Sequence, residues 1–130
     1  MKYLLDTQML IWAAALPESL PDRAMKLIGD PKNELFFSPA SLWEVAIKSG
    51  LGKPSFQFDA SLLRRGLLDN NYRELAITGL HAAGVGGLPD IHKDPFDRML
   101  LAQAKADGLW LLTSDSVLKK YPAPVELAAP

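Results

Sequence analysis

Four acidic residues, spread over most of the chain, have the types and positions that point to chemistry. They are Asp6, Glu44, Asp97 and Asp115. Asp6 directly follows the apolar run 3–5, and Asp115 follows the apolar run 109–112 after two polar residues. Glu44 and Asp97 lie early in helices predicted to begin after Ser38 and Pro95. Each acid is therefore predicted at the end of a strand or near the start of a helix.

A cluster of these four acids would favour a divalent metal ion. Carboxylates that lie together repel one another, so they need a cation or must be partly protonated. Ligand sets made only of oxygen suit Mg²⁺ or Mn²⁺, and the absence of cysteine excludes a zinc–thiolate site. Such ions activate water and stabilise negative charge during phosphodiester cleavage. The acids thus predict a metal-dependent phosphodiesterase with one or two ions.

The apolar pattern predicts elements that would bring the acids together. Strands are predicted at 3–5, 34–37, 73–77, 109–112 and, as a short edge strand, 125–127. Helices are predicted at 8–16, 22–28, 39–48, 60–68, 79–83, 96–106 and 114–120, with Thr7 as the cap of the first. Alternation of helices with fully apolar strands predicts an α/β/α sandwich around a mainly parallel sheet of four to five strands. Ligands bind at the carboxyl edge of such a sheet, where the returning helices begin.

Each acid also has a purely structural explanation. Asp6 could be a turn residue and Asp115 a helix cap. Glu44 could belong to a capping box or pair with Lys48, one turn further on. Asp97 could simply interact with the helix dipole. Their shared placement at one predicted edge favours function over these explanations.

Three other residues near the predicted site have structural explanations. Asp94 precedes Pro95 and is expected to cap the helix rather than to compete with Asp97 as a ligand. His81 and His92 are isolated histidines, which are more often surface or loop residues than catalytic groups. The sequence does not decide the role of His92.

Composition indicates a soluble globular protein. The chain has 130 residues, 48% of them apolar, which suits one domain spanning 1–130. The apolar run 9–16 is far below the ~20 residues that cross a bilayer, and the N-terminus does not resemble a signal peptide. We therefore expect a cytoplasmic protein without a membrane segment. The net charge of −1 gives no basic excess for binding nucleic acid, so a cation would have to neutralise phosphate locally.

Four segments resemble PIN-domain ribonucleases, and within them the VapC-type toxins of type II toxin–antitoxin pairs. They are Leu-Asp-Thr at 5–7, Ser-Leu-Trp-Glu-Val-Ala-Ile-Lys at 41–48, Asp-Pro-Phe-Asp-Arg at 94–98 with the helix after it, and Thr-Ser-Asp at 113–115. The segments occur in the family's order and cover essentially the whole chain. Many members of this branch have histidine where this chain has Gln8.

The resemblance implies cleavage of RNA with Mg²⁺ or Mn²⁺, a homodimer, and inhibition by a cognate antitoxin. The family's four acids match Asp6, Glu44, Asp97 and Asp115. Three hydroxyl residues match positions that support the metal ligands: Thr7, Thr113 and Ser114.

Two further sets of residues are candidates for contacts with partners. Lys48 and Arg98 are the basic residues best placed to hold RNA phosphate, although each could instead neutralise an acidic neighbour. Trp12 and Trp43 lie on apolar helices that could form a dimer interface and an antitoxin groove, or could simply pack on the sheet.

Two other functions were weighed against an endoribonuclease toxin. The first is a PIN nuclease of RNA processing that has no antitoxin. The second is an inactive PIN scaffold that binds a partner, which the presence of all four acids disfavours. The RNA target, the cut site and the identity of the antitoxin are not predicted.

Overall fold

A five-stranded parallel sheet forms the centre of the molecule. The computed structural model describes residues 1–129. The strand order is β3-β2-β1-β4-β5, and every neighbouring pair is parallel. The strands are β1 (Lys2–Leu5), β2 (Glu34–Phe37), β3 (Arg73–Glu74), β4 (Trp110–Thr113) and β5 (Val125–Leu127). The predicted α/β fold with a parallel sheet is confirmed, and β1 lies at its centre.

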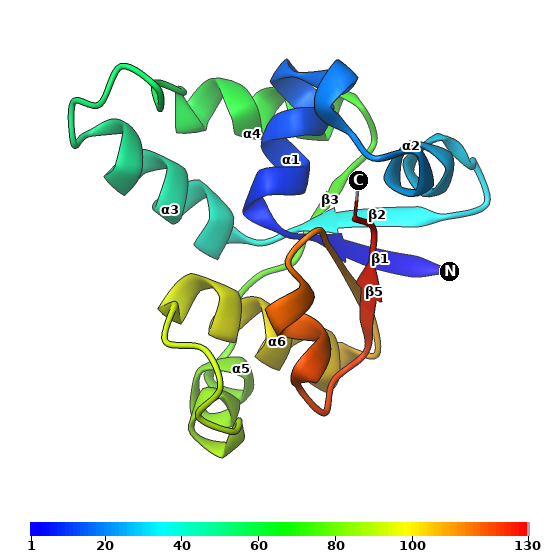
Figure 1. Ribbon diagram of the computed structural model, residues 1–130, viewed down its shortest axis with the longest axis vertical. Helices are drawn as coiled ribbons and strands as arrows, with labels where there is room; N and C mark the ends of the chain where they lie inside the picture. The colour runs from blue at the N-terminus through cyan, green and yellow to red at the C-terminus, as the bar shows by residue number, and fades with distance from the viewer. Residues whose placement is uncertain (130) are drawn as a thin grey trace.

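Helices cover both faces of this sheet. The α-helices are α1 (Thr7–Ala15), α2 (Asp22–Gly29), α3 (Pro39–Ser49), α4 (Ala60–Asp69), α5 (Gly79–Gly84) and α6 (Pro95–Asp107). Short 3₁₀ helices occur at η1 (Pro17–Ser19), η2 (Val85–Gly87) and η3 (Ser116–Lys120). Figure 1 shows α1, α2 and α4 on one side of the sheet and α5 and α6 on the other, with α3 near its edge.

Successive residues of β1 point into opposite halves of the core. Leu4 packs with residues of α6, β4 and η3, and Leu5 packs with residues of α1, α2 and α4. Both leucines are fully buried. This alternation follows from the two-residue period of a strand, and it requires apolar residues throughout a central strand.

Besides shifts of one residue at several ends, three features differ from the sequence prediction. Asp6, not Thr7, caps α1, because its Oδ1 accepts the backbone N–H of Met9. The third strand ends at Glu74 rather than at residue 77, and the carbonyl of the next residue, Leu75, accepts instead from the buried side chain of Gln103. The last predicted helix is the short 3₁₀ turn η3.

Among residues 1–129, no helix combines the length and apolar character needed to cross a bilayer.

Candidate active site

A pocket of about 180 Å³ opens where β1 and β4 end and α6 begins. All four predicted acids line this pocket, together with Asp94, which was predicted only as a helix cap. The complete lining comprises Asp6, Thr7, Gln8, Ile11, Glu44, Lys48, Phe56, Asp94, Asp97, Ser114 and Asp115. Larger hollows elsewhere on the molecule contain fewer acidic groups, so size alone would not have identified this one.

Thr113 connects the acids that follow the two central strands. Its hydroxyl donates to Asp6 Oδ2 and accepts the backbone N–H of Asp115 at 3.0 Å. Asp6 Oδ1 is occupied by the Met9 N–H at 2.9 Å, and Asp115 Oδ1 by the N–H of Val117 at 3.0 Å. Both acids thus act as helix caps and also line the pocket.

Glu44 is held from α1 and from its own helix. Thr7 donates its hydroxyl proton to Glu44 Oε1 at 2.6 Å, and Thr7 Oγ1 lies 2.9 Å from the hydroxyl of Ser41. Lys48 pairs with Glu44 Oε2, which confirms the neighbouring pair proposed from the sequence. The capping box suggested for Glu44 is not the local structure, because α3 begins at Pro39 and Ser38 is its cap.

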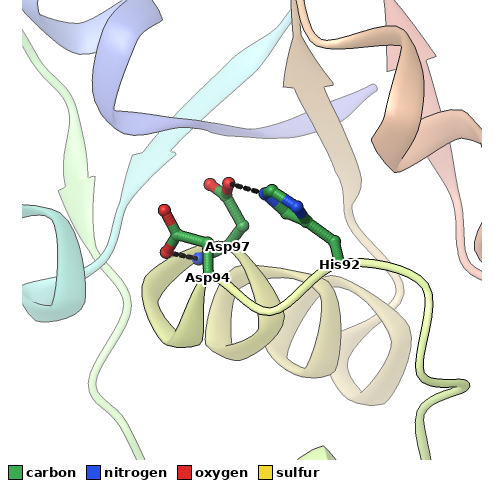
Figure 2. A group of neighbouring side chains, drawn as sticks. All are labelled: His92, Asp94 and Asp97. Atoms are coloured by element: carbon green, nitrogen blue, oxygen red, sulfur yellow. Dashed lines mark hydrogen bonds and ion pairs between the residues drawn. The ribbon is translucent and has the colours of Figure 1, made fainter.

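Asp97 lies at the start of α6 beside Asp94 and His92. Asp94 Oδ1 accepts the backbone N–H groups of Phe96 and Asp97, so its predicted capping role is confirmed. His92 Nε2 lies 3.1 Å from Asp97 Oδ2. In Figure 2 the two carboxylates project to the same side of the helix, and each has a second oxygen directed away from it.

Burial shifts the titration of the two acids deepest in this site. Desolvation raises the pKa of Asp97 to about 7, with the nearby charges of Asp94 and Asp6 adding to the effect. Desolvation also raises the pKa of Asp6 to about 6, although its bonds to Thr113 and Met9 oppose the shift. Both shifts follow mainly from burial, which disfavours the charged form of each carboxyl.

The residues present fit a divalent cation. Ligand atoms of His92, Asp94 and Asp97 lie within 4.8 Å of one another, a spacing that one ion could bridge. The pocket adds the carboxylates of Asp6 and Asp115. Carboxylate oxygens favour Mg²⁺ and Mn²⁺, and a bound cation would stabilise the ionised forms of these buried carboxyls.

Arg98 has a different environment from the one predicted. Its guanidinium donates to the backbone carbonyls of Val85, Leu88, Pro89 and His92, and to the hydroxyl of Tyr121, over 2.8–3.4 Å. These bonds use the donors that a phosphate would need. They make Arg98 a brace for the loop before α6, and its contact with RNA stays a prediction.

Sequence reasoning also missed Phe56, which lines the pocket from the loop between α3 and α4. Its ring meets Phe58 edge to face, with ring centroids 5.0 Å apart. The sequence signal was weak, because an aromatic residue in a glycine- and proline-rich loop has no periodic pattern. Its place in the same pocket as Lys48 becomes evident only from the fold.

Comparison with known families agrees with this geometry. Residues 3–124 match the family model described as the PIN domain. The chain belongs to the PIN-domain family. Membership implies a nuclease, because PIN domains hydrolyse nucleic acid with divalent metals. The family resemblance predicted from the four sequence segments is therefore confirmed.

Solved structures share the fold of this PIN domain at low sequence identity. A chain of DNA-bound VapBC from Salmonella typhimurium has a TM-score of 0.70 and 17% identity, and the match covers 99% of both chains. A chain of VapBC2 from Rickettsia felis, bound to a promoter DNA fragment, has a TM-score of 0.68 and 16% identity, and the match covers 98% of both chains. A chain of VapBC-5 from Mycobacterium tuberculosis has a TM-score of 0.63 and 15% identity, and the match covers 99% of this chain and 98% of the other. None of the curated proteins matches the sequence significantly.

Proposed function

We propose that this PIN domain is a Mg²⁺- or Mn²⁺-dependent endoribonuclease and the toxin of a type II toxin–antitoxin pair. The observation that carries the proposal is the pocket lined by Asp6, Glu44, Asp97 and Asp115. Its four predicted acids come from distant parts of the sequence, so the structural explanation available for each one separately does not account for their convergence. The family match supports treating 1–130 as one PIN domain.

Three of the acids are suited to holding the cation. Asp6, Asp97 and Asp115 would supply oxygen ligands, supported by Thr113 and by the neighbouring Ser114. A divalent ion bound there supplies an acidified water and stabilises charge on the phosphate oxygens. Family membership alone indicates divalent metal use, and the identity of the ion is part of this proposal.

Glu44 is suited to proton transfer or to orienting water. It is 5% exposed and receives bonds from Thr7 and Lys48, so its carboxylate is fixed at the pocket wall. A held carboxylate next to the reacting phosphate can accept a proton from attacking water. Thr7, whose hydroxyl binds Glu44 Oε1, is the residue that we assign to support this carboxylate.

Two pocket residues provide contacts for RNA. Lys48 is partly exposed at the pocket, and its bond to Glu44 raises its pKa, which keeps it positively charged beside a phosphate. Phe56 offers a ring on which an unpaired base could stack. Single-stranded RNA, whose bases are free to stack, is therefore the substrate class that we propose.

The proposed partners are a cognate antitoxin and a second copy of this chain. The structural relatives named above are VapBC proteins, which supports an antitoxin partner. Trp43 is 63% exposed and meets Phe96 edge to face, while Trp12, on α1, is partly buried against the core. Trp43 and the nearby exposed Ile47 are the best candidates for the homodimer interface. A cytoplasmic location, where RNA and an antitoxin would be met, belongs to the same proposal.

Purified wild type and the variants Asp6→Asn and Asp97→Asn test the activity. The wild type should cut single-stranded RNA internally with Mg²⁺ or Mn²⁺ and lose cleavage with EDTA. Each variant should lose at least about 100-fold in rate, since the metal ligands carry the chemistry. Their thermal stability without metal should hold or rise, because one repelling charge is gone. Cleavage at the wild-type rate by a folded variant would remove that acid from the site.

Co-expression separates the toxin from a processing nuclease. Growth arrest on expression, relieved by a small protein encoded beside this chain, is expected for the toxin. A nuclease that cuts RNA without arrest or relief would favour RNA processing. A folded protein that binds RNA without cutting it under any metal would favour an inactive scaffold.

A further inference from the structure

His92 is fixed in place by contacts to its backbone. Its N–H donates to the Tyr121 hydroxyl at 2.7 Å, and its carbonyl lies 3.1 Å from the same oxygen. The Tyr121 side chain is itself buried, at 4% exposure. Both backbone groups of a loop residue are therefore held by one ring anchored in the core.

Arg98 adds a second support to the same loop. It binds the carbonyl of His92 as well as that of Pro89 and the hydroxyl of Tyr121. Because Arg98 directly follows Asp97 on α6, the loop that carries His92 is joined to the helix that carries the acid. The position of His92 relative to Asp97 is thus set by several bonds.

These supports aim the His92 ring at Asp97. Nε2 lies 3.1 Å from Oδ2, and Figure 2 shows the ring approaching the carboxylate from the side opposite Asp94. An ionised carboxylate only accepts hydrogen bonds, so in the metal-bound form Nε2 must carry the proton and donate. One oxygen of Asp97 is then occupied by the ring, and the other is the oxygen available to a cation.

We propose that His92 is a positioning residue for the metal centre, which orients the Asp97 carboxylate by donating from Nε2 and so raises the affinity of the site for its cation. This inference rests on the proposed function and names a residue that acts through Asp97. Hydrogen-bonded partners of ligating groups typically contribute about 10–100-fold to metal affinity.

Direct ligation by His92 is the competing arrangement, and ion selectivity distinguishes the two. An imidazole ligand favours Mn²⁺ over the harder Mg²⁺. Losing such a ligand would weaken Mn²⁺ binding more than Mg²⁺ binding. Losing a positioning bond to a carboxylate would weaken both by a similar factor.

The test compares His92→Ala and His92→Gln in the full chain. Mn²⁺ affinity would be measured by calorimetry without RNA, and Mg²⁺ affinity by competition with Mn²⁺. His92→Ala should weaken both ions about 10–100-fold. His92→Gln, whose amide can also donate, should recover much of that loss. Thermal unfolding in EDTA would show that both variants fold.

His81→Gln is a matched control. His81 Nε2 lies 3.0 Å from Asp107 Oδ2 near the other end of α6, so this variant also disturbs a bond between histidine and aspartate. It should leave the affinities for Mn²⁺ and Mg²⁺ within about twofold of the wild type, because its partner is outside the pocket.

Two results would overturn the inference. Unchanged affinities for both ions in a folded His92→Ala variant would reject the positioning role of His92 and leave the proposed function intact. A loss confined to Mn²⁺ would also reject it, and would identify His92 as a metal ligand. If the wild type bound neither ion, the proposed function would fall as well, so the two failures can be told apart.

Discussion

Thr113 on β4 donates its hydroxyl proton to Asp6, 107 positions earlier in the chain. The same oxygen accepts the backbone N–H of Asp115 at 3.0 Å. One buried side chain therefore sets the relative position of two pocket acids that follow neighbouring strands. Both its donor and its acceptor capacity are used in this arrangement.

Replacing Thr113 with valine should weaken the metal site. The variant keeps the shape of the side chain but removes the bond that lowers the pKa of Asp6, so that pKa should rise further. We expect a roughly 10-fold loss of Mn²⁺ affinity and a shift of the cleavage profile to higher pH. Thr113→Ser retains the hydroxyl and should behave nearly as the wild type. Equal affinities for the valine and serine variants would contradict the role of this bond.

Without metal, the protein should lose stability as pH rises from 5 to 8. Asp6 and Asp97 have pKa values raised from the usual 3.8 to about 6 and about 7. In this window the folded state retains protons that the unfolded chain has released, so the free energy of unfolding falls with increasing pH. We expect the melting temperature in EDTA to drop by on the order of 5 °C.

The variant Asp97→Asn isolates the contribution of that acid to the pH dependence. It should show a clearly smaller drop. Saturating Mn²⁺ should reverse the trend in the wild type, because the ion binds ionised carboxylates. A melting temperature in EDTA that rises with pH would be incompatible with these pKa shifts.

Lys48 and Arg98 should respond differently to alanine substitution. Lys48→Ala should raise the Michaelis constant and flatten the salt dependence of cleavage by about one unit of slope, as expected for one lost phosphate contact. Arg98→Ala should keep the wild-type slope but destabilise the protein by about 1–3 kcal/mol, because it leaves loop carbonyls without donors. Cleavage rates against salt, with Mg²⁺ in excess, and thermal unfolding would separate the two roles. An unchanged slope in Lys48→Ala would place the phosphate contact elsewhere.

Phe56 should contribute to the binding of unpaired RNA. A base stacked on an aromatic ring contributes about 1–3 kcal/mol, so Phe56→Ala should raise the Michaelis constant for single-stranded RNA about 10-fold. Phe56→Trp should retain most of the affinity. Leu62→Ala, which removes another exposed apolar side chain, is the control for general surface effects. Equal Michaelis constants for the wild type and Phe56→Ala would exclude stacking at this position.

The strands and their carboxyl edge could be predicted from the sequence, because apolar runs mark buried strands and the edge follows from parallel topology. The strand β2 (Glu34–Phe37) was predicted with its observed limits. The strand positions and the parallel topology were enough to predict that the four acids converge at this edge, without knowledge of side-chain contacts. Strand β3 was predicted too long: beyond Glu74, the carbonyl of Leu75 accepts from the side chain of Gln103, which is distant in sequence.

The histidine contact and the role of Arg98 could not be predicted from the sequence. His92 reaches Asp97 because Tyr121, 29 positions further along, holds its backbone. Arg98 follows Asp97 in sequence, but successive residues of a helix point in different directions and do not face one another. The adjacency of Arg98 and Asp97 in the sequence therefore suggested that both belong to the site. In the fold their side chains point in different directions. The prediction that Asp94 caps α6 is correct, but capping uses only Oδ1. The residue also lines the pocket, which its capping role did not indicate.

The central position of β1 also determines when the pocket can form. During synthesis, Thr113 is added 107 residues after Asp6, the acid that it holds. A growing chain carries Asp6 and Glu44 early, but no complete pocket exists until β4 has been made and has paired with β1. Assembly of the pocket thus depends on the pairing of β4 with β1, which becomes possible only after most of the chain has been synthesised.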